Sequence, residues 1–296
     1  MKILVIVGPT AVGKSDLTVE LALKFKGEVI SADSRQIYEG LDIGTGKITK
    51  EEMRGIPHHL LSEVKPSRQF SVAEFKILAE QKIADIAERG KLPLVCGGTG
   101  FYIQALVDNL LLPEVLPDKT LRNELEKKTS QELFKILRDF DPKRAGLIDV
   151  KNKRRLIRAI EIIKALGKVP LLAKPETKFN PLIIGLDLPD DTLRKNISAR
   201  ISKRIKKGMI AEAEGLRKKG LTWKRMNELG LEYRYLAKLL REEISREEFI
   251  AVLEQKIWQY AKRQRTWFRR DGRIKWFEPS EVKNVIAVVS DFLSND

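Results

Sequence analysis

The first 38 residues, MKILVIVGPTAVGKSDLTVELALKFKGEVISADSRQIY, decide the fold. Residues 3–7 form a continuous apolar and β-branched run, which is typical of a strand buried on both faces of a parallel sheet. Residues 8–15, GPTAVGKS, follow directly and match GxxxxGK[ST] in full, and residues 16–23 continue at helical spacing. Strand, glycine-rich loop and helix therefore come in the order that a phosphate-binding loop requires.

This loop predicts a phosphorylated ligand. Its glycines let the backbone wrap around an anion, and the N–H groups at the helix start point at that anion with the positive end of the helix dipole behind them. By the same motif Lys14 reaches the terminal phosphates and the Ser15 hydroxyl is a ligand for Mg²⁺. Because the loop binds a diphosphate whatever is attached to it, the rest of the ligand stays open at this point.

The composition is that of a globular protein with a heavily charged surface. The chain has 296 residues, of which 43% are hydrophobic and 33% are charged, and its net charge is +15. Such an excess favours a polyanionic partner, nucleic acid or an anionic membrane, although a generally basic proteome produces the same excess. The single cysteine, Cys96, excludes an internal disulfide framework and a cysteine-rich zinc site. The adjacent His58 and His59 point in different directions, so no metal site is expected there.

Sequence features also predict the compartment. The chain begins inside a core strand, so no cleavable signal is expected before it. No apolar run approaches the roughly 20 residues of a membrane span. We therefore expect a cytoplasmic protein with no membrane partner, and a monomer.

Two further strand ends are expected beside the phosphate loop. The apolar segment 28–32 runs into Asp33, and the segment 93–96 runs into Gly97, Gly98 and Thr99. In an open α/β sheet, ligands bind beyond the carboxyl ends of the strands, so both segments deliver their polar residues to the same edge. Asp33 would hold Mg²⁺ through water, take a proton from a nucleophile, or simply cap a turn. Thr99 offers a hydroxyl.

A helical insertion is expected in the middle of the chain. Strand patterns stop near residue 112 and return at residue 181 with the buried-strand run PLIIGL. Helical spacing occupies four segments between them: 120–128, 131–139, 142–148 and 151–166. We predict an α/β fold, a P-loop NTPase-like core with a parallel sheet flanked by helices (1–111 and 181–296), and an all-helical insertion domain (112–180).

Basic residues concentrate in two helical segments. Residues 151–158 carry five positive charges, with Arg154, Arg155 and Arg158 on one helix face, which suits phosphate contacts as well as a solvated face. Residues 262–270, KRQRTWFRR, interleave basic residues with aromatic residues, as surfaces that bind nucleic acid often do. Alternatively, the aromatic rings pack this helix on the core. Further helices are expected at 191–207, 235–241, 246–270 and 285–293.

Eight short motifs come in order along the chain: GPTAVGKS (8–15), SADSRQIY (31–38), GLDIGTGK (40–47), IPHHL (56–60), FSVAEF (70–75), GGTGFY (97–102), LEYR (231–234) and KRQRTWFRR (262–270). Together they closely resemble the bacterial tRNA dimethylallyltransferases. The resemblance implies transfer of a dimethylallyl group from dimethylallyl diphosphate to N6 of the adenine 3′ of the anticodon, tRNA position 37. The sequence departs from the family pattern at residues 149–152, which read DVKN in place of a segment like HPND. It also departs at Gly46, where alanine is common in the family.

The resemblance also assigns the catalytic residues. Lys14 would neutralise the departing diphosphate, Ser15 would hold the cofactor Mg²⁺, and Arg234 of LEYR would add a contact. Asp33 matches the general base, and Thr99 matches the threonine that helps to position the reacting groups. The implied diphosphate contacts are the whole loop with that arginine: Gly8, Pro9, Thr10, Ala11, Val12, Gly13, Lys14, Ser15 and Arg234.

The implied RNA partner is the anticodon stem-loop of tRNA. The target adenine must leave the stack of that loop, and the stretch after the second strand would hold the flipped base. The implied tRNA contacts are Asp33, Ser34, Arg35, Gln36 and Thr99 in the core, and Arg122, Arg154, Arg155, Leu156, Ile157 and Arg158 in the insertion.

Three other functions share parts of this pattern. A prenyltransferase that acts on free adenine nucleotides would not need the charge of +15 or a basic insertion. A small-molecule P-loop kinase would bind ATP more tightly than dimethylallyl diphosphate. A non-catalytic RNA-binding protein would not need Asp33, Lys14 and Thr99 at one sheet edge.

Overall fold

The computed structural model describes residues 1–170 and 175–295. The chain divides into two compact units, one made of Met1–Asp108 with Thr177–Asp296 and the other of Asn109–Glu176. These boundaries lie a few residues before those expected from the sequence, because the strand pattern marks the return to the sheet and not the connection that leads to it.

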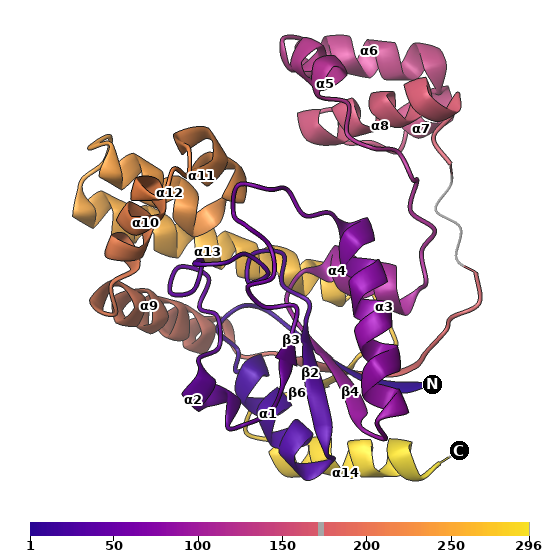
Figure 1. Cartoon of the computed structure of the whole chain (residues 1–296), viewed down its shortest axis with the longest axis vertical. Coiled ribbons are helices and arrows are strands. Elements are labelled where there is room, and N and C mark those ends of the chain that lie inside the picture. Colours follow the sequence, from indigo (N-terminus) through magenta and orange to yellow (C-terminus); the bar gives the residue numbers. More distant parts are fainter. Residues whose placement is uncertain (171–174, 296) are drawn as a thin grey trace. The chain divides into compact units, whose positions relative to one another are not determined.

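The first unit is built on one six-stranded parallel sheet, as predicted (Figure 1). The strands lie in the order β3-β2-β4-β1-β5-β6. Their bounds are β1 (Lys2–Val7), β2 (Gly27–Ser31), β3 (His58–His59), β4 (Leu92–Cys96), β5 (Asn180–Leu186) and β6 (Lys275–Phe277). In β1, Ile3 to Val7 are wholly buried, which explains a run with no alternation. The three-residue edge strand β6 was not predicted, since so short a segment carries no periodicity.

The register aligns the ends of three strands. Ile6 of β1 pairs with Cys96 of β4, and Ser31 of β2 pairs with the same Cys96. The loops that follow β1, β2 and β4 therefore leave the sheet at one level. The prediction that these loops meet at one edge is confirmed.

Ten helices of the first unit lie within the described residues: α1 (Lys14–Lys24), α2 (Lys50–Met53), α3 (Val72–Glu88), α4 (Gly100–Val107), α9 (Asp190–Lys206), α10 (Met209–Lys218), α11 (Trp223–Leu229), α12 (Leu231–Leu240), α13 (Arg246–Phe268) and α14 (Val282–Ser294). Helix α3 begins with the predicted capping box of Ser71 and Glu74. Helices α9 to α13 pack on one another as a helical cluster (Figure 1). LEYR forms the first turn of α12, so this helix starts earlier than the predicted residue 235.

The two histidines have a structural role in the sheet. Both form the short strand β3, and His59 Nε2 lies 2.8 Å from Glu28 Oε2 of β2. Glu28 is 2% exposed and also bonds to Arg89 and Lys91. These cations hold the pKa of Glu28 well below its usual range, with the bond from Arg89 as the largest cause.

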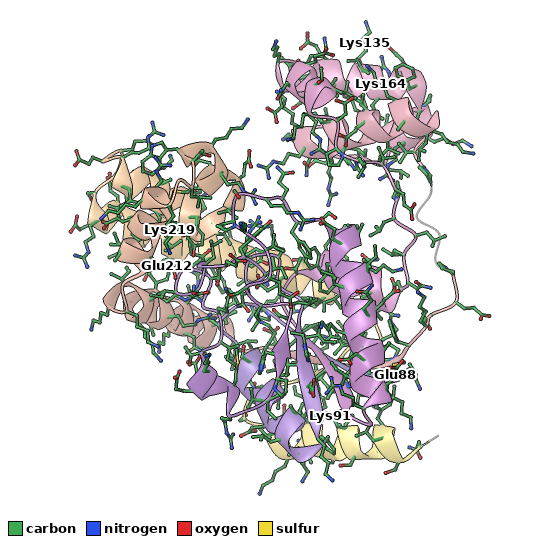
Figure 2. All side chains as sticks on the ribbon, viewed as in Figure 1. Glu88, Lys91, Lys135, Lys164, Glu212 and Lys219 are labelled. Atoms are coloured by element: carbon green, nitrogen blue, oxygen red, sulfur yellow. The ribbon has the colours of Figure 1, made fainter. Side chains whose placement is uncertain are left out.

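The second unit contains helices and no strand among its described residues. Its helices are α5 (Lys119–Glu126), α6 (Ser130–Phe140), α7 (Pro142–Ala145) and α8 (Lys153–Leu166). They bury their apolar faces in a small separate core, in which Leu133, Leu137 and Leu156 are fully buried. Lys135 and Lys164 are exposed on α6 and α8 (Figure 2).

None of the helices in the described part of the chain has the length and apolar character to cross a membrane.

Candidate functional site

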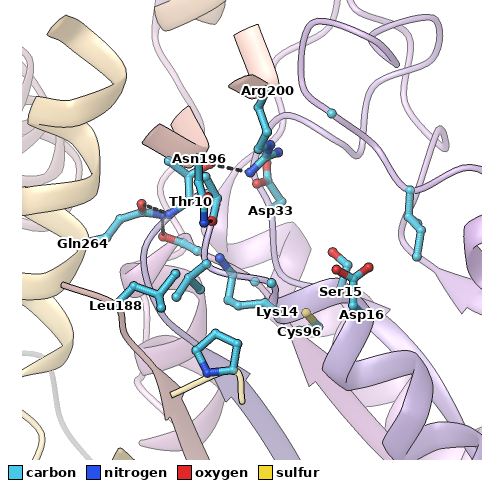
Figure 3. Close-up of a pocket in the computed structure, with 18 of the residues that line it drawn as sticks. Thr10, Lys14, Ser15, Asp16, Asp33, Cys96, Leu188, Asn196, Arg200 and Gln264 are labelled. Atoms are coloured by element: carbon cyan, nitrogen blue, oxygen red, sulfur yellow. Dashed lines mark hydrogen bonds between the residues drawn. The ribbon is translucent and has the colours of Figure 1, made fainter. Parts of the chain in front are cut away.

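A cavity of about 690 Å³ lies over the carboxyl ends of the strands in the first unit (Figure 3). The phosphate loop forms one side of it, and the loops after β2 and β4 contribute Asp33 and Gly98. Helix α9 adds Arg200, and helix α13 adds Gln264. The cavity therefore collects residues from segments that lie far apart in the sequence.

The phosphate loop depends on its glycines. A Cβ on Gly8, whose φ is +143°, would lie 2.3 Å from the carbonyl oxygen of Leu186, so only glycine fits beside β5. Gly13, with a φ of +92°, is the N-cap of α1, and the loop amides that follow lead into the helix. Ala11 has a φ of +65°, a strained conformation for a residue with a side chain.

Lys14 lies in the cavity as predicted. Its Nζ donates a hydrogen bond to the carbonyl oxygen of Pro9 over 2.7 Å. Burial, and to a smaller extent the nearby positive charge of Arg200, lower the pKa of Lys14 to about 8, because both disfavour its charged form. An anion that enters this cavity would meet the ammonium group and stabilise its charged form.

Helices α9 and α13 hold the phosphate loop from outside. The Oε1 atom of Gln264 accepts a hydrogen bond from the Thr10 N–H at 2.9 Å, and Asn196 Nδ2 donates to the carbonyl oxygen of Ala11 at 3.2 Å. Arg200 donates to Thr10 Oγ1 at 3.3 Å, so Gln264 and Arg200 both contact Thr10 (Figure 3). Gln264 and Asn196 were missed from the sequence, because their helices approach the loop only through tertiary packing.

Asp33 and Thr99 meet at the predicted edge. Thr99 Oγ1 accepts a hydrogen bond from the Ser34 N–H at 3.1 Å. Asp33 Oδ1 accepts from the N–H groups of Arg35 (2.8 Å) and Gln36 (3.3 Å), so Asp33 also makes the turn considered as its alternative role. Among the described residues, Oδ2 of Asp33 has no hydrogen-bond partner, and Asp33 lines the cavity. Its second carboxylate oxygen is therefore available to a substrate.

A second cavity of about 250 Å³ adjoins the first. Thr10, Asp33, Thr45 and Tyr260 line both cavities. The second cavity is also lined by Ser34, Arg35, Arg204, Glu232 and Arg263. Asp33 thus lies on the wall between a cavity with a phosphate loop and a cavity with polar and cationic side chains.

The residues present fit a magnesium ion that arrives with a diphosphate. The Ser15 hydroxyl and the Asp16 carboxylate line the large cavity beside Lys14, and Asp33 lines it as well (Figure 3). Mg²⁺ prefers oxygen ligands, retains several waters and is usually held by one or two side chains together with substrate phosphates. The described residues hold no cluster of three His, Cys, Asp or Glu, which such a shared site does not require.

Comparisons with known proteins point to the same family over nearly the whole chain. Residues 36–271 match the family model described as IPP transferase, and residues 1–69 match a model described as isopentenyl transferase. A tRNA dimethylallyltransferase of Halalkalibacterium halodurans is 42% identical over 95% of this chain and 92% of its own. Another, of Acetivibrio thermocellus, is 40% identical over 98% and 95%. The chain belongs to the IPP transferase family.

Solved structures of IPP transferases have the same fold. The tRNA isopentenylpyrophosphate transferase of Bacillus halodurans is similar with a TM-score of 0.75 and 38% identity, over 98% of this chain and 96% of that one. A eukaryotic dimethylallyltransferase described as acting on tRNA has a TM-score of 0.86 at 28% identity, over 99% and 80%. The expected resemblance is confirmed in sequence and in fold.

One predicted diphosphate contact of this IPP transferase, Arg234, lies outside both cavities. Arg234 is exposed on α12 and donates to the carbonyl oxygen of Asn227 at 3.1 Å, and it lines neither cavity. Arg200 of α9 takes the place expected for it, since its guanidinium lines the large cavity next to Thr10. The LEYR motif instead contributes Glu232 to the second cavity.

The predicted tRNA contacts in the insertion of this IPP transferase fall into three groups. Leu156 is fully buried and Ile157 is 7% exposed in the core of the insertion, so these two were wrongly predicted to contact tRNA. Arg122 and Arg158 both pair with Glu161, which is 2% exposed, and so stabilise the unit. Arg154 and Arg155 are exposed on α8, and these remain the predicted contacts with tRNA.

Proposed function

We propose that this IPP transferase transfers the dimethylallyl group of dimethylallyl diphosphate to N6 of the adenine at tRNA position 37 and releases diphosphate. The observation that carries the proposal is the place of Asp33 on the wall shared by the two cavities. The large cavity, with the phosphate loop, takes the donor. The smaller one, with Ser34 and Arg35, takes the flipped adenine.

The phosphate loop favours departure of the leaving group. As the bond between the allylic carbon and the diphosphate oxygen breaks, negative charge grows on the diphosphate. Lys14, Arg200 and the amides at the start of α1 are held in place to receive that charge before the reaction begins. When bound at Ser15, Mg²⁺ supplies further positive charge to the same phosphates.

Asp33 acts on the nucleophile. The exocyclic amine of adenine is conjugated with its ring, so it attacks carbon well only if a base takes its proton as the new carbon–nitrogen bond forms. Two backbone N–H groups fix Oδ1 of Asp33 and leave Oδ2 for that proton. The bond from the Ser34 N–H to Thr99 Oγ1 keeps the loop after β2 in place during the transfer.

The tRNA substrate accounts for the charge of the chain. We propose that the enzyme binds the anticodon stem-loop, with Arg154 and Arg155 of the insertion on its phosphates, and works as a monomer in the cytoplasm. The net charge of +15 and the exposure of both arginines support this proposal. The names of the relatives, tRNA dimethylallyltransferases, support tRNA as the acceptor.

The test is a single-turnover assay with labelled dimethylallyl diphosphate, Mg²⁺ and either an anticodon stem-loop or free AMP. Label in the stem-loop alone is the expected result. Label in AMP would replace the tRNA enzyme by a nucleotide prenyltransferase. Label in neither, together with turnover of ATP, would make the protein a kinase and overturn the proposal.

A further inference from the structure

The glycine-rich loop of residues 40–47, GLDIGTGK, has no role in the chemistry above, yet it reaches the reaction site. Thr45 lines both cavities and Gly46 lines the large one. Gln36 Nε2 donates to the carbonyl oxygen of Gly46 at 3.4 Å, which joins this loop to the segment after Asp33. The position of the 40–47 loop therefore helps to shape the wall on which Asp33 lies.

A single carboxylate holds the first half of this loop. Glu212 Oε2 accepts hydrogen bonds from the N–H groups of Asp42 (2.9 Å) and Ile43 (2.6 Å), and Oε1 accepts from the Gly44 N–H (2.9 Å). Glu212 comes from α10, about 170 residues further along the chain, in the helical cluster (Figure 2). Three consecutive backbone amides thus converge on one side chain, an arrangement suited to a negative charge.

Two neighbours complete this contact. The Tyr233 hydroxyl donates to Glu212 Oε1 at 2.7 Å, and a Cβ on Gly44 would lie 2.7 Å from that hydroxyl oxygen, so the loop packs closely on the ring. Arg204 of α9 donates to the carbonyl oxygens of Gly44 (3.2 Å) and Thr45 (3.3 Å). Its guanidinium also lines the second cavity. The helical cluster thus holds the loop by its N–H groups and by its carbonyl groups.

We infer that Glu212 is a positioning residue for the transfer: by binding the amides of residues 42–44 it fixes Thr45 and Gly46 on the wall between donor and acceptor. This inference rests on the proposed function. Glu212 lines neither cavity, so it acts through the loop and not on the substrates. Loss of the Glu212 contact should therefore slow the transfer step in the assembled complex, because misplaced reacting groups slow the chemical step.

The chemistry of the side chain makes the inference testable. Four donors converge on its two oxygens, and both must be acceptors. Glutamine would turn an NH₂ group toward one pair of these donors. The Tyr233 hydroxyl can reverse and accept a hydrogen bond, but a backbone N–H cannot, so Glu212→Gln must lose at least one backbone N–H bond while it keeps the size of the side chain. Glu214, exposed on the same helix, provides the matched control Glu214→Gln.

The experiment measures the single-turnover rate constant with saturating stem-loop and dimethylallyl diphosphate, and separately the affinity for the donor. For Glu212→Gln we expect a rate constant about tenfold lower and a donor affinity within about threefold, because Glu212 does not line the cavity that contains the phosphate loop. Glu214→Gln should match the wild type. A purely structural role would lower the fraction of active protein and leave the rate constant of that fraction unchanged.

Hydrogen exchange provides a readout that does not depend on activity. The amides of Ile43 and Gly44 should exchange faster in Glu212→Gln than in the wild type, with the exchange of β1 unchanged. If Glu212→Gln does not fold, Glu212→Asp tests the same contact, since its shorter arm cannot reach all three amides. Unchanged rate constants in the folded variant would overturn the positioning role. An inactive wild type would instead overturn the proposed function, and the positioning role with it.

Discussion

Gln264 Nε2 donates a hydrogen bond to the carbonyl oxygen of Gly98 over 2.8 Å. The same side chain accepts a bond from the Thr10 N–H, so one amide group of α13 joins the loop after β1 to the loop after β4. Gln264 is 5% exposed, and a Cβ on Gly98 would lie 2.2 Å from its Nε2. This bridge requires an amide, because one end must accept a hydrogen bond and the other must donate one.

Glu in place of Gln264 should therefore impair the site. Gln264→Glu turns a carboxylate oxygen toward the Gly98 carbonyl oxygen, and the two repel each other in a buried place. We expect kcat/KM for dimethylallyl diphosphate to fall by about tenfold to a hundredfold. Gln255→Glu, an exposed position on α13, is the matched control. Equal kcat/KM in both variants would show that the bridge does not maintain the site.

Removing the base should separate chemistry from binding. In Asp33→Asn the side-chain oxygen can still accept the N–H bonds of Arg35 and Gln36, so the turn after β2 is kept. We expect the single-turnover rate to fall by about a hundredfold or more, within the range of general base catalysis, with stem-loop affinity within about threefold. Filter binding and single-turnover kinetics on the same samples measure both. A parallel loss of affinity would make Asp33 an RNA contact and not the base.

Two arginines offer a direct comparison of sequence and structure. Arg200 lines the donor cavity and Arg234 does not, so Arg200→Ala should raise KM for dimethylallyl diphosphate by about tenfold or more. Arg234→Ala, the contact expected from the motif LEYR, should leave KM within about twofold. Steady-state kinetics with the stem-loop held at saturation decide between them. A larger effect at Arg234 would restore the expectation from the sequence.

Local patterns were enough to predict the sheet edge but not the helices that complete the site. The phosphate loop, Asp33 and Thr99 each follow a buried strand, and parallel strands bring their ends together whatever the remaining chain does. Arg200 and Gln264 reach the cavity only because α9 and α13 pack against these loops. The spacing of residues in the sequence gives no information about that packing.

The insertion shows the same limit in its basic helix. The spacing of Arg154, Arg155 and Arg158 indicated one basic face, but the spacing could not show that Glu161 is buried beneath it and binds Arg158. Leu156 and Ile157 lie inside the same run of residues and face the core. A run of charge in a sequence does not distinguish side chains that bind RNA from side chains that hold a helix pair together.

Salt dependence should distinguish these arginines. Replacing Arg154 and Arg155 by alanine removes two exposed charges, so the slope of log affinity for the stem-loop against log salt should flatten by about 0.7 to 0.9 for each lost phosphate contact. Arg158→Ala should instead lower the thermal stability, since it leaves the buried Glu161 with one cation fewer. An unchanged slope in the double variant would place the RNA surface elsewhere.

The pH dependence of donor binding should report on Lys14. Because burial lowers its pKa to about 8, the free enzyme loses the ammonium charge as the pH rises through 8, whereas an ordinary lysine would keep it to about 10.5. The bound diphosphate favours the charged form, so binding above this pKa must take up a proton. We expect the affinity for dimethylallyl diphosphate to be constant below about pH 7.5 and to fall by up to tenfold per pH unit above about pH 8.

Calorimetry from about pH 7 to about pH 10 measures this affinity and, in buffers of different ionisation enthalpy, the proton uptake. The control is Lys14→Met, which should bind the donor weakly and lacks the titrating ammonium group. Any pH dependence of its affinity comes from titration of the donor and is subtracted from that of the wild type. A wild-type affinity that stays constant to about pH 10 would mean that Lys14 keeps an ordinary pKa in the free enzyme. The ammonium group would then be hydrated in the empty cavity, and its bond to the Pro9 carbonyl would not reflect a desolvated charge.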